Sequence, residues 1–164
     1  MVLVYGTLGS PVENSASLSR ARFEQQRRSY TSQSSVLVWP DHRYLRHLSA
    51  SASILDDCTA LILGNADTNA AWSVAVGDDP RVSARRGGLT VDGTMCEGTE
   101  LFGACRVPRH DGGEGEVLLL VDTGPRAALL GAWHDAANAD RELDTFYRVD
   151  ASGALEVVAR LDDD

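Results

Sequence analysis

The sequence contains no lysine, so all 15 of its basic residues are arginines, and 24 acidic residues leave a formal net charge of −9. Without lysine, Schiff-base catalysis and a lysine-dependent phosphate loop are excluded. An acidic chain repels phosphate groups at long range. We therefore expect neither nucleic acid nor an anionic membrane as a partner.

Cysteine is also scarce. The three cysteines, Cys58, Cys96 and Cys105, show no CxxC or Cys/His ligand spacing, and their odd number favours free thiols in a reducing compartment. The N-terminus starts with Met1-Val2-Leu3-Val4, without a basic segment or a long apolar run, so we expect no secretion signal, no membrane span and a cytoplasmic location. His42 and His47 are five residues apart, which does not favour a shared metal, and we expect no metal site.

Three familiar functional motifs are missing. The sequence has no P-loop, no dinucleotide GxGxxG and no GxSxG nucleophile elbow. The loop from Gly6 to Ser10 partly resembles the hydroxyl-rich phosphate loop of flavodoxins, which makes FMN an alternative. Otherwise we expect no cofactor.

Short apolar runs that alternate with helical segments indicate an α/β fold. The predicted main strands cover residues 2–5, 36–39, 60–63, 100–107 and 117–121, with helices over about 11–30, 69–75 and 126–133. We predict one α/β domain over residues 1–164, a flavodoxin-like or Rossmann-like three-layer sandwich with a mostly parallel sheet. Its core covers about residues 1–133, with a β-hairpin insertion at 82–91 and a C-terminal hairpin within about 144–161.

The first helix has a clear start signal. Ser10 is a candidate N-cap, Pro11 occupies the first helical position and Glu13 follows at the capping-box position. A stripe at helical spacing predicts the packed face, and it contains Val12, Ala16, Ser19, Phe23 and Tyr30.

Three polar, glycine-bearing turns follow predicted strands, at Gly6 to Asn14, Gly64 to Asn69 and Asp122 to Gly124. Parallel strands bring such turns to one edge of the sheet, where open α/β folds bind ligands. The candidate ligand-binding residues are Thr7, Ser10, Asn14, Asn65, Thr68, Asn69, Arg86, Asp122 and Thr123.

Glu13 and Asp67 are the candidate acid/base pair. The competing interpretation is that these side chains cap helices and tie down turns, with Asp67 or Thr68 capping the helix that follows. Arg86 is either an anion-binding group or a solvated charge.

A family resemblance rests on Val4-Tyr5-Gly6-Thr7, on Leu63 to Trp72 and on the shorter matches Glu13-Asn14, Ala21-Arg22, Arg86-Gly87 and Thr123-Gly124. These residues resemble the C-terminal region of large bacterial prolyl-oligopeptidase-like proteins of the alpha/beta-hydrolase type. The peptidase-like segment of that family is missing here, so the resemblance implies an accessory α/β domain without a serine triad.

These observations lead to one main functional hypothesis and two alternatives. We expect a domain that binds a small polar or anionic molecule, as a hydrolase-like or biosynthetic enzyme or without catalysis. The alternatives are a non-catalytic subunit that docks onto a hydrolase partner or forms a homodimer, and an FMN-binding protein.

Overall fold

The computed structural model describes residues 1–32, 35–49, 58–77, 81–109, 116–137, 143–150 and 152–161. Its helices are α1 (Pro11–Ser32), α2 (Asp41–Leu48), α3 (Ala71–Val76) and α4 (Pro125–Ala137). Its strands are β1 (Val2–Tyr5), β2 (Leu37–Pro40), β3 (Ala60–Gly64), β4 (Val82–Arg85), β5 (Gly88–Val91), β6 (Thr94–Glu97), β7 (Leu101–Pro108), β8 (Glu116–Asp122), β9 (Thr145–Val149) and β10 (Leu155–Arg160). The predicted α/β class is confirmed.

The central sheet has seven strands in the order β10-β9-β7-β8-β3-β1-β2. Strands β2, β1, β3 and β8 are parallel to one another, and the remaining three join through antiparallel pairs. Five of the seven strands therefore run in one direction, and the sheet is mostly parallel, as predicted.

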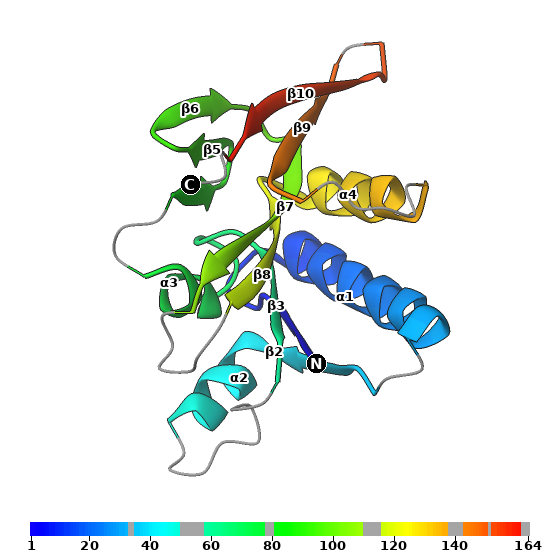
Figure 1. The fold of residues 1–164 in the computed structure, drawn as a ribbon, viewed down its shortest axis with the longest axis vertical. Coiled ribbons are helices and arrows are strands. Elements are labelled where there is room, and N and C mark those ends of the chain that lie inside the picture. The colour runs from blue at the N-terminus through cyan, green and yellow to red at the C-terminus, as the bar shows by residue number, and fades with distance from the viewer. Residues whose placement is uncertain are drawn as a thin grey trace.

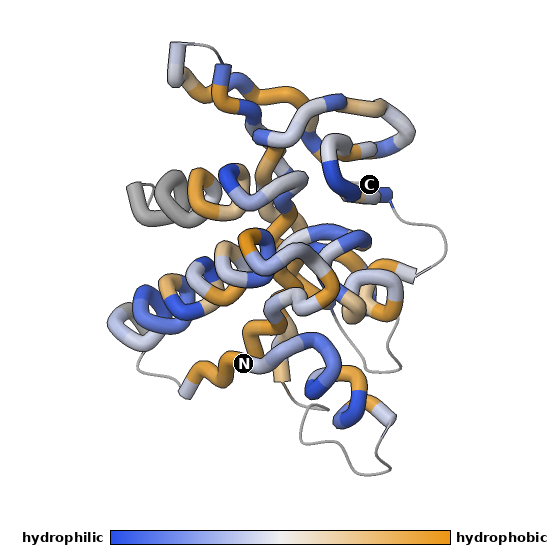
Figure 2. Tube along the Cα trace, turned by 180° about the vertical axis from the view of Figure 1, so that it is seen from behind, coloured by the Kyte–Doolittle hydropathy of each residue, from blue (hydrophilic) through white to orange (hydrophobic). Residues whose placement is uncertain are grey.

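Figure 1 shows α1 and α4 side by side on one face of this sheet, while α2 and α3 lie on the other. The small antiparallel sheet β4-β5-β6 covers the same face as α3. Strand residues alternate between two cores: Val2, Val4 and Ile62 face α2, α3 and the small sheet, whereas Leu3 and Leu61 face α1. The central strands form the apolar interior of the molecule in Figure 2.

The packed face of α1 differs from the predicted stripe. Val12 is 66% exposed and Tyr30 is 89% exposed, and the buried residues of this helix are Ala16, Ser17, Arg20, Ala21 and Glu24. The prediction from apolar periodicity was wrong because α1 buries two charged residues: Arg20, which pairs with Asp122 at the end of β8, and Glu24, which pairs with Arg27 one turn further along the same helix. The exposed Val12 is left at the surface beside α4.

Both predicted hairpins are present. Asp92 and Gly93, with φ values of 43° and 78°, form the tight turn between β5 and β6. The predicted insertion is extended by β6 into a three-stranded sheet, and β9 and β10 form the C-terminal hairpin. Residues 138–142 and 162–164 lie outside the described residues. Within the described ranges, no helix is both long and apolar enough to span a membrane.

Candidate functional site

The three polar turns meet at one edge of the sheet, because β1, β3 and β8 are adjacent and parallel. The first and second turns are in direct contact: the Leu8 N–H donates to the Thr68 carbonyl at 3.0 Å. A Cβ atom at Gly6 would lie 2.2 Å from that same carbonyl oxygen, so only glycine fits there. The first and second turns are therefore packed directly against each other.

The predicted capping box at the start of α1 is confirmed. The Ser10 N–H donates to Glu13 Oε2 at 2.7 Å, and the Glu13 N–H donates to Ser10 Oγ at 3.3 Å. Asn14 donates its amide to the carbonyls of Thr7 and Gly9. These side chains hold the first loop in shape.

Asp41, a residue that the sequence analysis missed, connects the loops. Its buried carboxylate accepts hydrogen bonds from the Thr7 N–H and hydroxyl, from the Ala70 N–H and from the His42 N–H, at 2.6 to 3.1 Å. It follows β2 directly, and β2 is parallel to β1. Asp41 could have been identified from the sequence by its position, because it closely follows the predicted strand at residues 36–39.

The second turn is held in place by hydrogen bonds of its own asparagine side chains. The Asn69 side chain donates to the carbonyls of Val4 and Leu63 and accepts from the Ala71 N–H. Asn65 donates to the carbonyl of Asp122 and accepts from the Asp67 N–H. Both asparagines are buried, so these polar groups face other parts of the protein. Neither Asp67 nor Thr68 caps α3, because the N-cap residue is Ala70 and Asn69 accepts the first helical N–H.

Glu13 and Asp67, the candidate acid/base pair, both contact the β4–β5 turn. Arg86 donates from Nε and Nη2 to the two Glu13 carboxylate oxygens at 2.6 and 3.1 Å. Asp67 accepts from the Arg86 N–H at 2.9 Å and lies 3.5 Å from the Arg85 guanidinium. The Arg86 hydrogen bond holds the pKa of Glu13 down at about 2, so this carboxylate is ionised.

The third turn binds the small sheet to the large one. The buried Thr123 hydroxyl donates to the Gly98 carbonyl and accepts from the Leu101 N–H, and the Thr123 carbonyl accepts from the Gly87 N–H. Asp122 is buried 3.4 Å from the Arg20 guanidinium. Burial raises the pKa of Asp122 to about 6, although Arg20 partly opposes this rise.

Between these turns lies a small recess. Its volume is about 10 Å³, room for about one water molecule, and its lining residues are Glu13, Ser17, Gly64, Thr68, Asp122, Gly124, Pro125 and Ala128. Within the described ranges, no three His, Cys, Asp or Glu residues are grouped to hold a metal ion.

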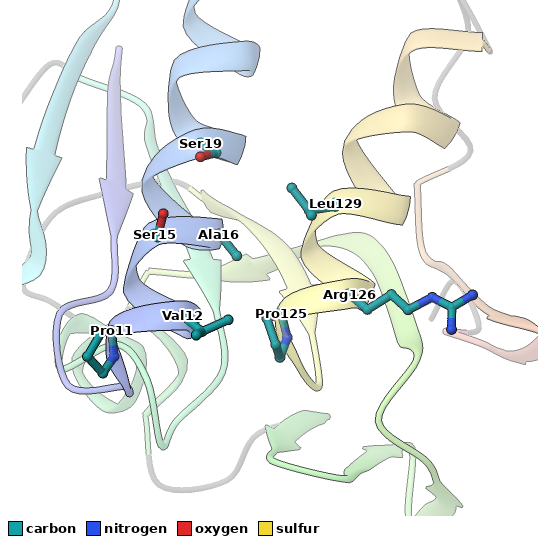
Figure 3. A pocket seen from close by; sticks show the side chains of 8 residues that line it. All are labelled: Pro11, Val12, Ser15, Ala16, Ser19, Pro125, Arg126 and Leu129. Carbon is teal, nitrogen blue, oxygen red and sulfur yellow. The ribbon is translucent and has the colours of Figure 1, made fainter.

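A much larger hollow lies beside the recess, between the first turns of α1 and α4. This groove has a volume of about 580 Å³ and is lined by Pro11, Val12, Ser15, Ala16, Ser19, Pro125, Arg126 and Leu129. Figure 3 shows Val12, Pro125 and Leu129 between the two helices, whereas the Arg126 guanidinium points away from α1. That guanidinium pairs with Glu100 at 2.8 Å. The sequence pattern did not predict this groove, although Val12, a residue of the predicted stripe on α1, is part of it.

The fold and this edge define a mixed α/β domain with a closed polar crevice and an open apolar groove. The chain matches no family model, and the comparisons with curated proteins and solved structures found no match either.

The Glu13 contacts can be separated by two substitutions. Glu13→Ala removes the cap and the ion pair and should lower the free energy of unfolding by about 1 to 2 kcal/mol. Glu13→Gln keeps a capping-box side chain and should cost less than about 1 kcal/mol, since the lost ion pair with Arg86 is half exposed.

Because the folded pKa of Glu13 is lowered from 4.5 to about 2, the ion-pair contribution is present above pH 4.5 and is lost as pH falls towards 2. Urea unfolding from pH 3 to 7 measures both effects, and equal losses for the two variants would contradict the assignment.

Proposed function

We propose that this chain is a ligand-binding α/β domain whose site is the groove between α1 and α4, and that its ligand is a small amphipathic molecule. The groove volume, the mostly apolar lining and the few hydroxyl groups are typical of small-molecule sites. The observation that carries the proposal is the position of this groove, at the carboxyl edge of the parallel strands and beside a crevice too small for a ligand.

In this proposal the polar residues of the crevice stabilise the structure around the groove. Asn65, Asn69 and Thr123 are buried and use their side chains within the protein, which favours a rigid frame for α1 and α4. The apolar part of the ligand would lie against Val12, Pro125 and Leu129. Ser15 and Ser19 would face its polar part.

We also propose the flavodoxin-like form of the fold. The parallel strands follow the order β2-β1-β3-β8, which corresponds to the first four strands of the flavodoxin order 2-1-3-4-5. In such sheets ligands bind outside the carboxyl ends of the strands, and the groove lies at that edge. The accessory-domain resemblance is compatible with this proposal.

Octanoate is a suitable first probe, with acetate as the control that has the same carboxylate without the apolar chain. We expect octanoate, but not acetate, to shift the NMR methyl signals of Val12 and Leu129. Ser15→Trp should abolish these shifts because the indole fills the groove from an exposed position. The matched control Ser29→Trp changes an exposed residue of α1 outside the groove and should leave binding unchanged.

Binding that survives Ser15→Trp would contradict the proposal. A complete lack of octanoate binding, together with a dimer in light scattering that Ser15→Trp converts to a monomer, would instead support the docking alternative.

A further inference from the structure

A second cavity lies between α1 and the amino ends of β3 and β8, at the opposite edge of the sheet from the α1–α4 groove. Its volume is about 360 Å³, and its lining residues are Met1, Arg28, Thr59, Leu61, Arg106, Glu116 and Leu118. Ligand sites in proteins start at about 300 Å³, so this cavity has room for a small molecule. It shares no residue with the groove.

The floor of this cavity is formed by side chains of three neighbouring strands. Arg106, Leu118 and Leu61 are partners in register across β7, β8 and β3. Glu116 lies two residues before Leu118, so its side chain points to the same face of the sheet. This is the face that α1 covers, because Leu61 and Leu118 belong to the core beneath that helix. The floor is therefore apolar, with a guanidinium and a carboxylate beside it.

The two charged groups beside the floor interact only loosely with each other. Both side chains are exposed, and Arg106 Nε lies 3.9 Å from Glu116 Oε2. This distance is longer than a hydrogen bond, and an exposed ion pair of this kind contributes little to stability. On the helix side of the cavity, Arg28 pairs with Glu24 at 3.4 Å. Arg106 and Glu116 can therefore exchange each other for ligand groups of opposite charge at little cost.

From the size of the cavity and its two charges we propose that it binds a small zwitterion, an α-amino acid with an aliphatic side chain. The ligand carboxylate accepts hydrogen bonds from the Arg106 guanidinium, whose N–H groups form a planar fork that matches a carboxylate. The ligand ammonium donates to the Glu116 carboxylate, and the aliphatic side chain lies against Leu118. A ligand with a single charge would leave either Arg106 or Glu116 without a counter-charge, so a zwitterion is favoured over a simple acid or amine.

Three probes with the same branched chain separate the two charges. L-Leucine carries both charges, 4-methylpentanoate lacks the ammonium group, and 3-methylbutylamine lacks the carboxylate. In NMR titrations of the purified full-length chain, we expect leucine to shift the Leu118 methyl signals with saturation. Each single-charge probe should bind about tenfold more weakly than leucine, as for the loss of one charge-assisted hydrogen-bonded pair.

Two substitutions assign the charges to their residues. Arg106→Gln should weaken leucine binding about tenfold without weakening the binding of 3-methylbutylamine, which has no carboxylate. Glu116→Gln should weaken leucine binding to a similar extent without weakening the binding of 4-methylpentanoate, which has no ammonium group. Arg160→Gln, at an exposed arginine of β10 outside the cavity lining, is the matched control and should leave all three affinities unchanged.

Several results would overturn the proposal: no shift of the Leu118 signals at millimolar leucine, equal affinity for the three probes, or an Arg106→Gln loss that is the same for leucine and 3-methylbutylamine. Circular dichroism melting checks that the three variants are folded. The outcome is independent of the octanoate test because the two sites share no residue.

Discussion

Asp41→Ala should lower the free energy of unfolding by about 3 kcal/mol. The substitution leaves the Thr7 N–H and hydroxyl, the Ala70 N–H and the His42 N–H without their acceptor. An unsatisfied buried donor costs about 1 to 3 kcal/mol, and relaxation of the loops recovers part of the sum. Asp41 connects three segments, and its loss should therefore loosen the whole carboxyl edge.

Urea unfolding at pH 7 measures this effect through the transition midpoint at constant m-value. Asp41→Asn keeps the size and one carbonyl acceptor, and we expect a smaller loss from it than from the alanine variant. Glu116→Ala is the matched control, because its carboxylate is exposed and lies 3.9 Å from Arg106, so the loss should stay below about 0.5 kcal/mol. A loss below about 1 kcal/mol for Asp41→Ala would contradict the role assigned to this carboxylate.

The position of the polar edge could be predicted from the sequence. Buried apolar runs such as Ala60 to Leu63 end in glycine-bearing polar turns, and local rules for strands and turns are sufficient to find them. The start of α1 at Pro11 was predictable for the same reason, because Ser10 and Glu13 form their capping hydrogen bonds within one turn of helix. These features depend on neighbours in the sequence.

The partners of the polar side chains could not be predicted in this way. Asn69 donates to Val4, 65 residues away, and Asn65 donates to the backbone of Asp122, 57 residues away. The same turn sequence could bind a ligand or form hydrogen bonds within the protein. Which of the two occurs depends on how close the neighbouring strands bring these carbonyls. The antiparallel direction of β7 likewise depends on its pairing with β8.

The packed face of α1 could not be predicted from the sequence either. Helical spacing selected Val12 and Tyr30, but the helix buries Arg20, which pairs with the buried Asp122, and Glu24, which pairs with Arg27 on the same helix. A buried charge is favourable only with a partner, and the partner of Arg20 is more than one hundred residues further along the chain. Val12, which is left outside the core, then lines the groove proposed as the ligand site.

Removal of the Arg20 guanidinium is expected to have the largest pH-dependent effect. Arg20→Met should lower the free energy of unfolding at pH 7.5 by about 3 to 5 kcal/mol, since it leaves the Asp122 carboxylate buried without its counter-charge. The loss should be smaller at pH 5, where protonation of Asp122 removes the charge that needs a partner.

The free energy of unfolding of the wild-type chain should also decrease as Asp122 loses its proton, but by a smaller amount than in Arg20→Met. The folded pKa of Asp122 is raised from 3.8 to about 6, so the folded state binds the proton more tightly than the unfolded state does. Stability from this group is therefore greatest at low pH and decreases as pH rises through 6, by about 1 kcal/mol between pH 5 and 7.5. Asp122→Asn removes the titrating group, and the wild-type minus variant difference in urea unfolding isolates it from the four histidines. If Arg20→Met loses the same free energy at both pH values, Asp122 is not the group that Arg20 neutralises.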